Sequence, residues 1–127
     1  MSHRFPVQVY YEDTDMGGVV YHANYLKFIE RARSDYVRQL GNDQNAMREA
    51  GIVWVVRRIT AEYISTARFE DQLMIETEVT SVSGARLSMG QRVLRGEQVI
   101  FTAEVEAVCM NAKGRPVRLP AEIRALL

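Results

Sequence analysis

The chain has 127 residues, of which 47% are hydrophobic, and its 16 Lys and Arg residues balance 16 Asp and Glu residues. This apolar content excludes a disordered chain, and the length predicts a single domain, residues 1–127, that buries roughly two thirds of its unfolded surface. A net charge of zero creates no field that attracts nucleic acid or anionic lipid, so we expect no nucleic-acid partner.

The N-terminus and the single cysteine indicate the cellular compartment. Residues 1–6 lack the apolar core of a signal peptide, and no uncharged run reaches the roughly 18 residues that cross a membrane. Cys109 lies in the apolar stretch 105–110, which favours a buried and reduced thiol. We therefore expect a cytoplasmic protein with no disulfide and no membrane span.

The N-terminal segment predicts a strand followed by a loop. Apolar and polar side chains alternate over Phe5–Tyr11, which is the two-residue period of a strand. Residues 12–18 are acidic and end in two glycines, a composition that favours a loop. His3 lies next to the terminus, and we assign it no role.

The longest helix is predicted directly after this loop. Apolar side chains recur at steps of three and four between Tyr25 and Leu40, so the helix should begin at His22 or Asn24. Asn24 is the candidate N-cap, and Gly41 is the candidate stop just beyond the helix.

The remainder of the chain is β-rich. A short turn or helix is expected within residues 42–51, and a surface turn within residues 111–118. Four long strands are predicted between them: Val53–Ile64, Gln72–Val82, Arg86–Arg95 and Gln98–Met110. Hairpin connections and one long helix specify the α+β class, with an antiparallel sheet wrapped on a single helix. Because such a sheet leaves its edges uncovered, we expect a homo-oligomer.

Several kinds of chemistry are excluded by composition. Two His residues and one Cys provide no zinc-ligand spacing, and the chain has no Gly-rich phosphate loop and no serine-nucleophile motif. We therefore expect no metal and no bound cofactor.

The segment Tyr10–Tyr25 crowds acids, glycines and a histidine against the start of the helix. A helix N-terminus offers unpaired N–H groups and the positive end of a dipole, which can polarise a carbonyl oxygen. Asp15 lies seven residues before His22, and the two glycines between them allow the chain to return its carboxylate to the helix start. By spacing alone, Asp13 and Asp15 could equally be turn or capping residues, and His22 a structural hydrogen-bonding residue.

At these residues the sequence resembles a known family. The run Tyr10–Arg33, YYEDTDMGGVVYHANYLKFIERAR, is similar to the signature of hotdog-fold acyl-CoA thioesterases of the 4-hydroxybenzoyl-CoA thioesterase family, and most similar to its Tol-Pal-cluster branch. The similarity continues along nearly the whole chain through four shorter segments: Val55–Tyr63, Ala67–Asp71, Gly84–Ser88 and Arg115–Pro120.

The resemblance implies a hotdog fold, in which a curved five-stranded antiparallel sheet wraps one long central helix. It implies dimers that form a homotetramer, with active sites at the subunit interface. The implied reaction is hydrolysis of an acyl-CoA substrate to a free carboxylic acid and CoA, and acyl carrier protein is a second candidate partner. By motif position Asp15 takes the place of the family's catalytic carboxylate, which acts as nucleophile or general base. The backbone N–H of His22 takes the place of the group that polarises the thioester carbonyl. The His22 imidazole is the branch's second functional group.

Further residues are candidates for substrate binding. Gly17 and Gly18 permit close approach of a substrate to the backbone, and Tyr25 lies in the first turn of the helix. Glu30 stands where the resembled family has an acid near its site, although it could instead form local pairs with Lys27 or Arg33. Many members of the resembled family carry a smaller Ala where this chain has Met16, so the shape of the acyl pocket is expected to differ.

The phosphates of CoA call for a cluster of basic residues. Five candidates lie near strand ends or in turns: Arg57, Arg58, Arg86, Arg115 and Arg118. Of these we assign Arg86 to substrate binding.

Two other functions remain open. Hotdog proteins resembling hydratases use a His with an acid on 3-hydroxyacyl thioesters, and His22 could serve in that reaction, which releases no thiol. A module that only binds acyl thioesters or partner proteins would also release no thiol, whatever the acyl chain.

Overall fold

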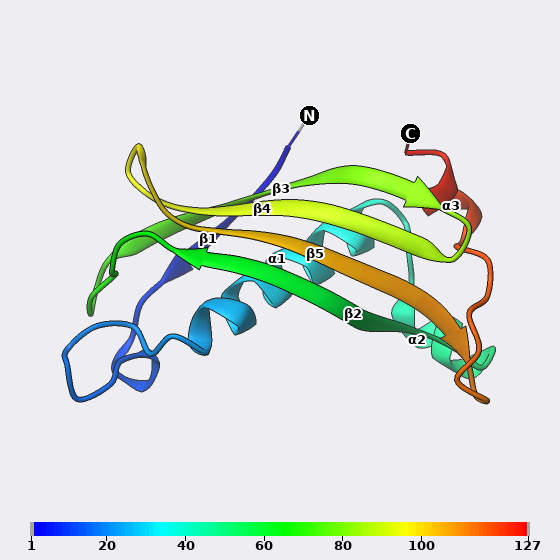
Figure 1. Ribbon diagram of the computed structural model, residues 1–127, viewed down its shortest axis with the longest axis horizontal. Helices are drawn as coiled ribbons and strands as arrows, with labels where there is room; N and C mark the ends of the chain where they lie inside the picture. The colour runs from blue at the N-terminus through cyan, green and yellow to red at the C-terminus, as the bar shows by residue number, and fades with distance from the viewer. Residues whose placement is uncertain (1, 127) are drawn as a thin grey trace.

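The computed structural model describes residues 2–126, which form one curved sheet around one long helix (Figure 1). The antiparallel sheet has five strands: β1 (His3–Gln8), β2 (Ile52–Tyr63), β3 (Gln72–Ser83), β4 (Arg86–Arg95) and β5 (Gln98–Asn111). Their order across the sheet is β1-β3-β4-β5-β2, so β1 and β2 form its two edges. The helices are α1 (Asn24–Gln39), α2 (Gln44–Glu49) and α3 (Ala121–Arg124), with a single 3₁₀ turn, η1, at Tyr11–Asp13.

Helix α1 lies along the concave side of the sheet, which curves over it (Figure 1). The helix buries the stripe that the sequence predicts, including Tyr25, Phe28 and Ile29, because apolar residues every three or four positions form one face. These side chains join a core with inward-facing strand residues such as Ile75 and Phe101. The expected α+β architecture, a sheet wrapped on one helix, is confirmed.

The long hairpins follow the predicted breaks. Ser83 pairs with Arg86, and Arg95 pairs with Gln98, so that each turn between them has two residues. Each turn begins with a glycine at positive φ, Gly84 at 60° and Gly96 at 62°, as tight hairpin turns require. The predicted bounds of β3, β4 and β5 are therefore correct to within one residue.

The two ends of α1 differ in how well the sequence predicts them. Gly41 has a φ of 90°, its N–H donates to Arg38 O, and the next N–H, of Asn42, donates to Val37 O, so the predicted stop is confirmed. At the other end the predicted N-cap is wrong. Asn24 is already the first helical residue, and its side-chain amide donates to a loop carbonyl instead of capping the helix.

The first strand ends earlier than the predicted Phe5–Tyr11. β1 spans His3–Gln8, and η1 follows it almost at once. The cause is the Asp13 carboxylate, which accepts a 2.8 Å hydrogen bond from the Tyr10 backbone N–H and turns the chain away from the sheet.

His3 also differs from the expectation, because it belongs to the packed structure. It is only 9% exposed, its Nε2 lies 2.7 Å from Asp35 Oδ2, and its ring stacks on that of Tyr36. The terminal strand is therefore tied to the C-terminal half of α1.

Gln91 on β4 fastens the opposite side of α1 to the sheet. Its buried amide donates to Ile29 O and to Thr77 Oγ1, both at 2.9 Å, and its oxygen accepts from Arg33 Nη1 at 3.0 Å. Burial lowers the pKa of Arg33. Helix and sheet are thus held in one relative position by a shared polar side chain as well as by the core.

Cys109 is fully buried, and its burial raises the pKa of the thiol to about 11, so the expectation of a buried thiol is confirmed. Within the described range 2–126, no helix is long and apolar enough to cross a membrane.

Candidate active site

The segment between β1 and α1 folds into a tight reversal that presents Asp15. Thr14 and Val20 form an antiparallel bridge, and the Asp15 N–H donates to Val19 O at 2.9 Å. The Gly18 N–H donates back to Asp15 O at 3.0 Å, with a φ of 78° that disfavours residues carrying a side chain. The two glycines therefore produce the chain reversal that the sequence predicts.

Asp13 holds this reversal to the start of α1. Its side chain is buried, and its backbone oxygen accepts from the Tyr21 N–H at 2.9 Å and from Asn24 Nδ2 at 3.0 Å. On the other side, the Val20 N–H donates to Ala67 O at 2.8 Å. This geometry agrees with a role for Asp13 in ordering the loop.

Asp15 itself remains exposed to solvent. Its Oδ1 accepts a 2.8 Å hydrogen bond from the Gly17 N–H, so the turn role that spacing alone suggested is present. A Cβ at position 17 would lie 3.2 Å from that same oxygen. Because Gly17 has no side chain, the Asp15 carboxylate can hold this position without steric crowding.

A groove of about 320 Å³ opens at the N-terminus of α1. It brings together residues from the reversal, the helix start and the end of β2: Asp15, Val19, Val20, His22, Tyr25, Tyr63, Ile64, Ser65 and Thr66. Among residues 2–126, the N–H groups of His22 and Ala23 donate to no backbone carbonyl. The groove therefore combines a carboxylate, unpaired N–H groups and the positive end of a helix dipole.

Two tyrosines, Tyr25 and Tyr63, line this groove. Tyr25 stacks on Phe101 with ring centroids 5.1 Å apart, and its hydroxyl oxygen accepts from the Ala67 N–H at 3.1 Å. Burial raises the pKa of Tyr25, so its hydroxyl stays neutral. Tyr63 crosses over the helix start, and its hydroxyl donates to His22 O at 2.9 Å.

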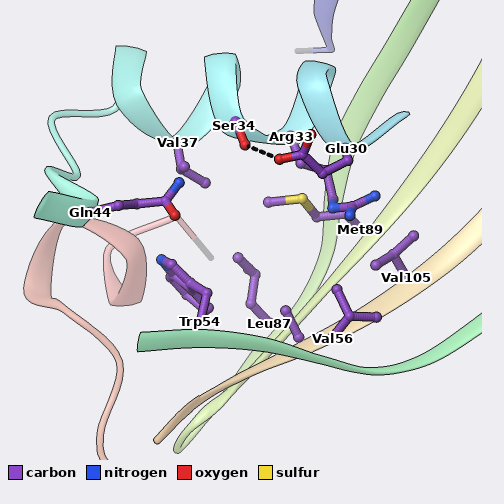
Figure 2. A pocket seen from close by; sticks show the side chains of 11 residues that line it. Glu30, Arg33, Ser34, Val37, Gln44, Trp54, Val56, Leu87, Met89 and Val105 are labelled. Atoms are coloured by element: carbon purple, nitrogen blue, oxygen red, sulfur yellow. Dashed lines mark hydrogen bonds between the residues drawn. The ribbon is translucent and has the colours of Figure 1, made fainter. Parts of the chain in front are cut away.

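Glu30 lies elsewhere, beside a second cavity of about 200 Å³ between α1 and the sheet (Figure 2). Its Oε1 accepts a 2.8 Å hydrogen bond from Ser34 Oγ, and in residues 2–126 no salt bridge joins it to Lys27 or Arg33. The cavity has a largely apolar lining below a polar rim: Glu30, Arg33, Ser34, Val37, Gln44, Trp54, Val56, Leu87, Met89, Val105 and Ala107.

Arg86 is not brought to the groove. Its guanidinium lies 3.5 Å from Glu106 Oε1, and Arg57 binds the other oxygen of the same carboxylate at 2.7 Å. Because Leu87 is buried towards the helix, the preceding residue of the strand faces the outer side of the sheet.

The sequence reasoning missed the wall formed by residues 63–66. A tyrosine at the end of a strand, followed by polar residues, carries no signal of its own for a site. No group of three or more candidate metal-ligating side chains occurs within the described part of the chain.

Residues 9–127 match the model of the Thioesterase-like superfamily, and the chain belongs to that superfamily. Over 123 residues it is 45% identical to the acyl-CoA thioesterase YbgC of Haemophilus influenzae, covering 95% of this chain and 90% of that protein. It is 46% identical to the acyl-CoA thioester hydrolase YbgC of Escherichia coli O6:H1 over 124 residues, covering 96% of this chain and 92% of that protein.

A solved structure of a probable thioesterase from Bartonella henselae has the same fold. It matches with a TM-score of 0.89 and 38% identity, covering 94% of this chain and 100% of that one. The fold is thus the expected hotdog fold.

Proposed function

We propose that this protein is an acyl-CoA thioesterase, which hydrolyses an acyl-CoA thioester to a free carboxylic acid and CoA. The observation that carries the proposal is the exposed Asp15 carboxylate in a groove with the unpaired N–H groups at the start of α1. The two YbgC relatives, named as an acyl-CoA thioesterase and an acyl-CoA thioester hydrolase, support the same reaction.

In this mechanism the thioester carbonyl oxygen accepts a hydrogen bond from the His22 N–H, which stabilises the negative charge that develops there. Asp15 either attacks the carbonyl carbon, forming a mixed anhydride that water then hydrolyses, or removes a proton from an attacking water. In both routes the C–S bond breaks and CoA leaves as a thiolate that takes up a proton. The His22 imidazole, exposed at the groove, is the second polar group near the reacting atoms.

The motif Tyr10–Arg33 supports placement in the Tol-Pal-cluster branch. With it we propose a single hotdog domain over residues 1–127, a cytoplasmic location and acyl carrier protein as a second source of acyl thioesters.

The free edge of β2 supports dimerisation. Among the described residues this 12-residue strand pairs only with β5, and its exposed backbone groups can bind another strand. Five apolar residues on or just after it are at least 36% exposed: Val53, Val56, Ile59, Tyr63 and Ile64. Antiparallel pairing of β2 with β2 of a second copy would cover both the edge and this apolar surface. Two such dimers would form the homotetramer.

Such a dimer would join the two hollows of the molecule. Within one chain they are separated, since Val56 beside the cavity and Tyr63 beside the groove are seven residues apart on β2, roughly 23 Å. Antiparallel pairing about the middle of β2 places the cavity of one copy beside the groove of the other. The acyl group would then enter the cavity of the second copy, with Glu30 at its rim.

The size of the cavity supports a compact acyl group. A cavity of roughly 150 Å³ holds one benzene ring, and this one measures about 200 Å³. We therefore expect short-chain and single-ring acyl-CoA thioesters to be hydrolysed with a higher kcat/KM than thioesters of long-chain acids.

The test is a panel of short-chain, medium-chain, long-chain and aromatic acyl-CoA thioesters, with a thiol reagent to measure CoA release. A parallel absorbance assay on 3-hydroxyacyl-CoA detects an enoyl product. Thiol release without enoyl formation is expected. Enoyl formation without thiol would instead identify a hydratase, and saturable binding with no product would identify a binding module.

A further inference from the structure

We infer that Tyr63 is a positioning residue for the proposed hydrolysis, because it fixes the peptide that follows His22 and thereby the unpaired Ala23 N–H, next to the His22 N–H that polarises the thioester carbonyl. The inference rests on the proposed function and adds a residue that carries none of its chemistry. Tyr63 is the last residue of β2, and its hydroxyl reaches the start of α1 to donate to His22 O at 2.9 Å.

The two peptides beside His22 are held by different partners. The Tyr21 oxygen accepts a hydrogen bond from the Asn24 N–H at 2.8 Å, so this C=O points towards the helix. The His22 N–H belongs to the same trans peptide, in which C=O and N–H point in opposite directions, so it points away from the helix. The next peptide is held by Tyr63, which binds the His22 oxygen. The Ala23 N–H must then point away from Tyr63.

The start of α1 has no side-chain cap that could replace this bond. Its N-cap residue is Ala23, which has no polar side chain, and no acidic residue occupies the first turn. Side chains usually stabilise the first turn of a helix at these positions. The Tyr63 hydroxyl therefore adds a contact from the sheet to a turn that is otherwise held by its own backbone and by two hydrogen bonds to the backbone oxygen of Asp13.

Packing holds the Tyr63 ring in place. Its centroid lies 5.0 Å from that of Phe101 and 5.6 Å from that of Tyr25, in edge-on geometries of 73° and 82°. It lies 6.2 Å from the His22 ring, also edge-on. The phenol thus bridges the core of the sheet and the backbone of His22.

The position of Tyr63 also gives the site a link to assembly. Tyr63 ends β2, the strand whose free edge we propose as the dimer contact. Pairing of β2 with a second copy would therefore also fix Tyr63, and through its hydroxyl the backbone oxygen of His22.

Loss of the hydroxyl should affect the chemical step far more than substrate binding, because it alters the backbone next to the N–H that polarises the thioester carbonyl.

The experiment compares wild type with Tyr63→Phe, which keeps the ring and removes the hydroxyl, and with Tyr36→Phe as the matched control. Tyr36 stacks on His3, on the far half of α1. Steady-state kinetics on the best thioester of the panel, thermal unfolding and sedimentation are measured for all three proteins. We expect the kcat of Tyr63→Phe to fall about fivefold to tenfold, the scale of one hydrogen bond, with KM within about twofold. The assembly and the shape of the pH profile should not change, and the midpoint of unfolding should fall by about 5 °C at most.

A wild-type kcat in Tyr63→Phe would overturn the inference, as would a loss confined to KM or one matched by Tyr36→Phe. A changed alkaline limb of the pH profile would also overturn it, since Tyr63 would then transfer a proton rather than position a peptide. If wild type itself releases no CoA from any thioester, the proposed function fails, and the role of Tyr63 falls with it.

Discussion

Asp15 is held by its neighbours without being buried. One of its oxygens accepts a hydrogen bond from the Gly17 N–H, while the groove leaves the side chain open to a substrate. A carboxylate fixed in direction and open to the groove can reach a bound thioester or its attacking water, as both a nucleophile and a general base must. The lack of a side chain at Gly17 therefore leaves the Asp15 carboxylate free to hold this position.

We predict different outcomes for alanine at the two glycines. In Gly17→Ala the new Cβ would lie 3.2 Å from Asp15 Oδ1, so the carboxylate must move, and kcat should fall at least about tenfold with little change in unfolding. In Gly18→Ala nothing lies within 4 Å of the new Cβ, but the φ of 78° should cost about 1 kcal/mol of stability. Kinetics and chemical unfolding of both variants check this. Equal effects of both on kcat and stability would refute the distinction.

The elements are joined to one another by a few polar side chains at opposite sides of α1. His3 ties β1 to the C-terminal half of the helix, and its hydrogen bond, followed by that of Arg38, lowers the pKa of Asp35 below its ordinary 3.8. Such a carboxylate stabilises the folded state fully above its unfolded pKa, and this stabilisation is lost as pH falls through the lower folded pKa.

We therefore predict that acid weakens wild type more steeply than Asp35→Asn. Between pH 5 and about pH 2.5 the Tm of wild type should fall further than that of the variant, because only wild type must protonate a carboxylate that is stabilised by folding. A His3→Gln variant, which removes the main cause of the lowered pKa, should show the same shallower dependence. Parallel Tm curves for wild type and Asp35→Asn would contradict this account.

The same elements show what the sequence could predict. Helix α1 has a regular period of 3.6 residues, and glycines mark its end and the two hairpin turns that join β3, β4 and β5, so these bounds were predictable. The bulges that shift the register between Val79 and Ser81 and between Val93 and Leu94 were not. The end of β1 was not, because it depends on a hydrogen bond from the Tyr10 backbone to the Asp13 carboxylate. His3 was missed for a similar reason: its partner, Asp35, is distant in sequence.

The site was predictable only in its contiguous part. Asp15, the glycines and His22 lie in one segment, which the fold returns to the helix start as expected. Tyr63 joins them through tertiary folding, and no local pattern marks it. The outward position of Arg86 follows from the sequence, because the alternation along β4 that buries Leu87 turns the preceding side chain to the outer face of the sheet.

The monomer leaves β2 as an exposed edge strand and keeps its two hollows apart. Its groove and its cavity lie at different positions along β2, and residues of this edge strand line both. A two-fold axis near the middle of β2 would bring each groove to the other copy's cavity, which accounts for both the exposed apolar strand and the separation of the two hollows.

A mixing experiment tests this composite site. Ala107→Phe places a benzene ring in a cavity of about 200 Å³, while Asp15→Asn leaves the cavity open and removes the carboxylate. Each variant alone should have little activity. After the two are dissociated and re-associated together, mixed dimers contain one intact site, so CoA release should recover. Mixed dimers that demonstrably form and remain inactive would show that the site is not shared.

The role of Asp15 itself is tested most directly by CoA release from Asp15→Asn beside Asp13→Asn, with the fold of both verified by circular dichroism. Asp15→Asn should lower kcat at least about 100-fold and leave the unfolding midpoint near that of wild type. Asp13→Asn should lose stability more than turnover, since its carboxylate is buried against the Tyr10 N–H. Turnover by Asp15→Asn at the wild-type rate would contradict the proposed mechanism.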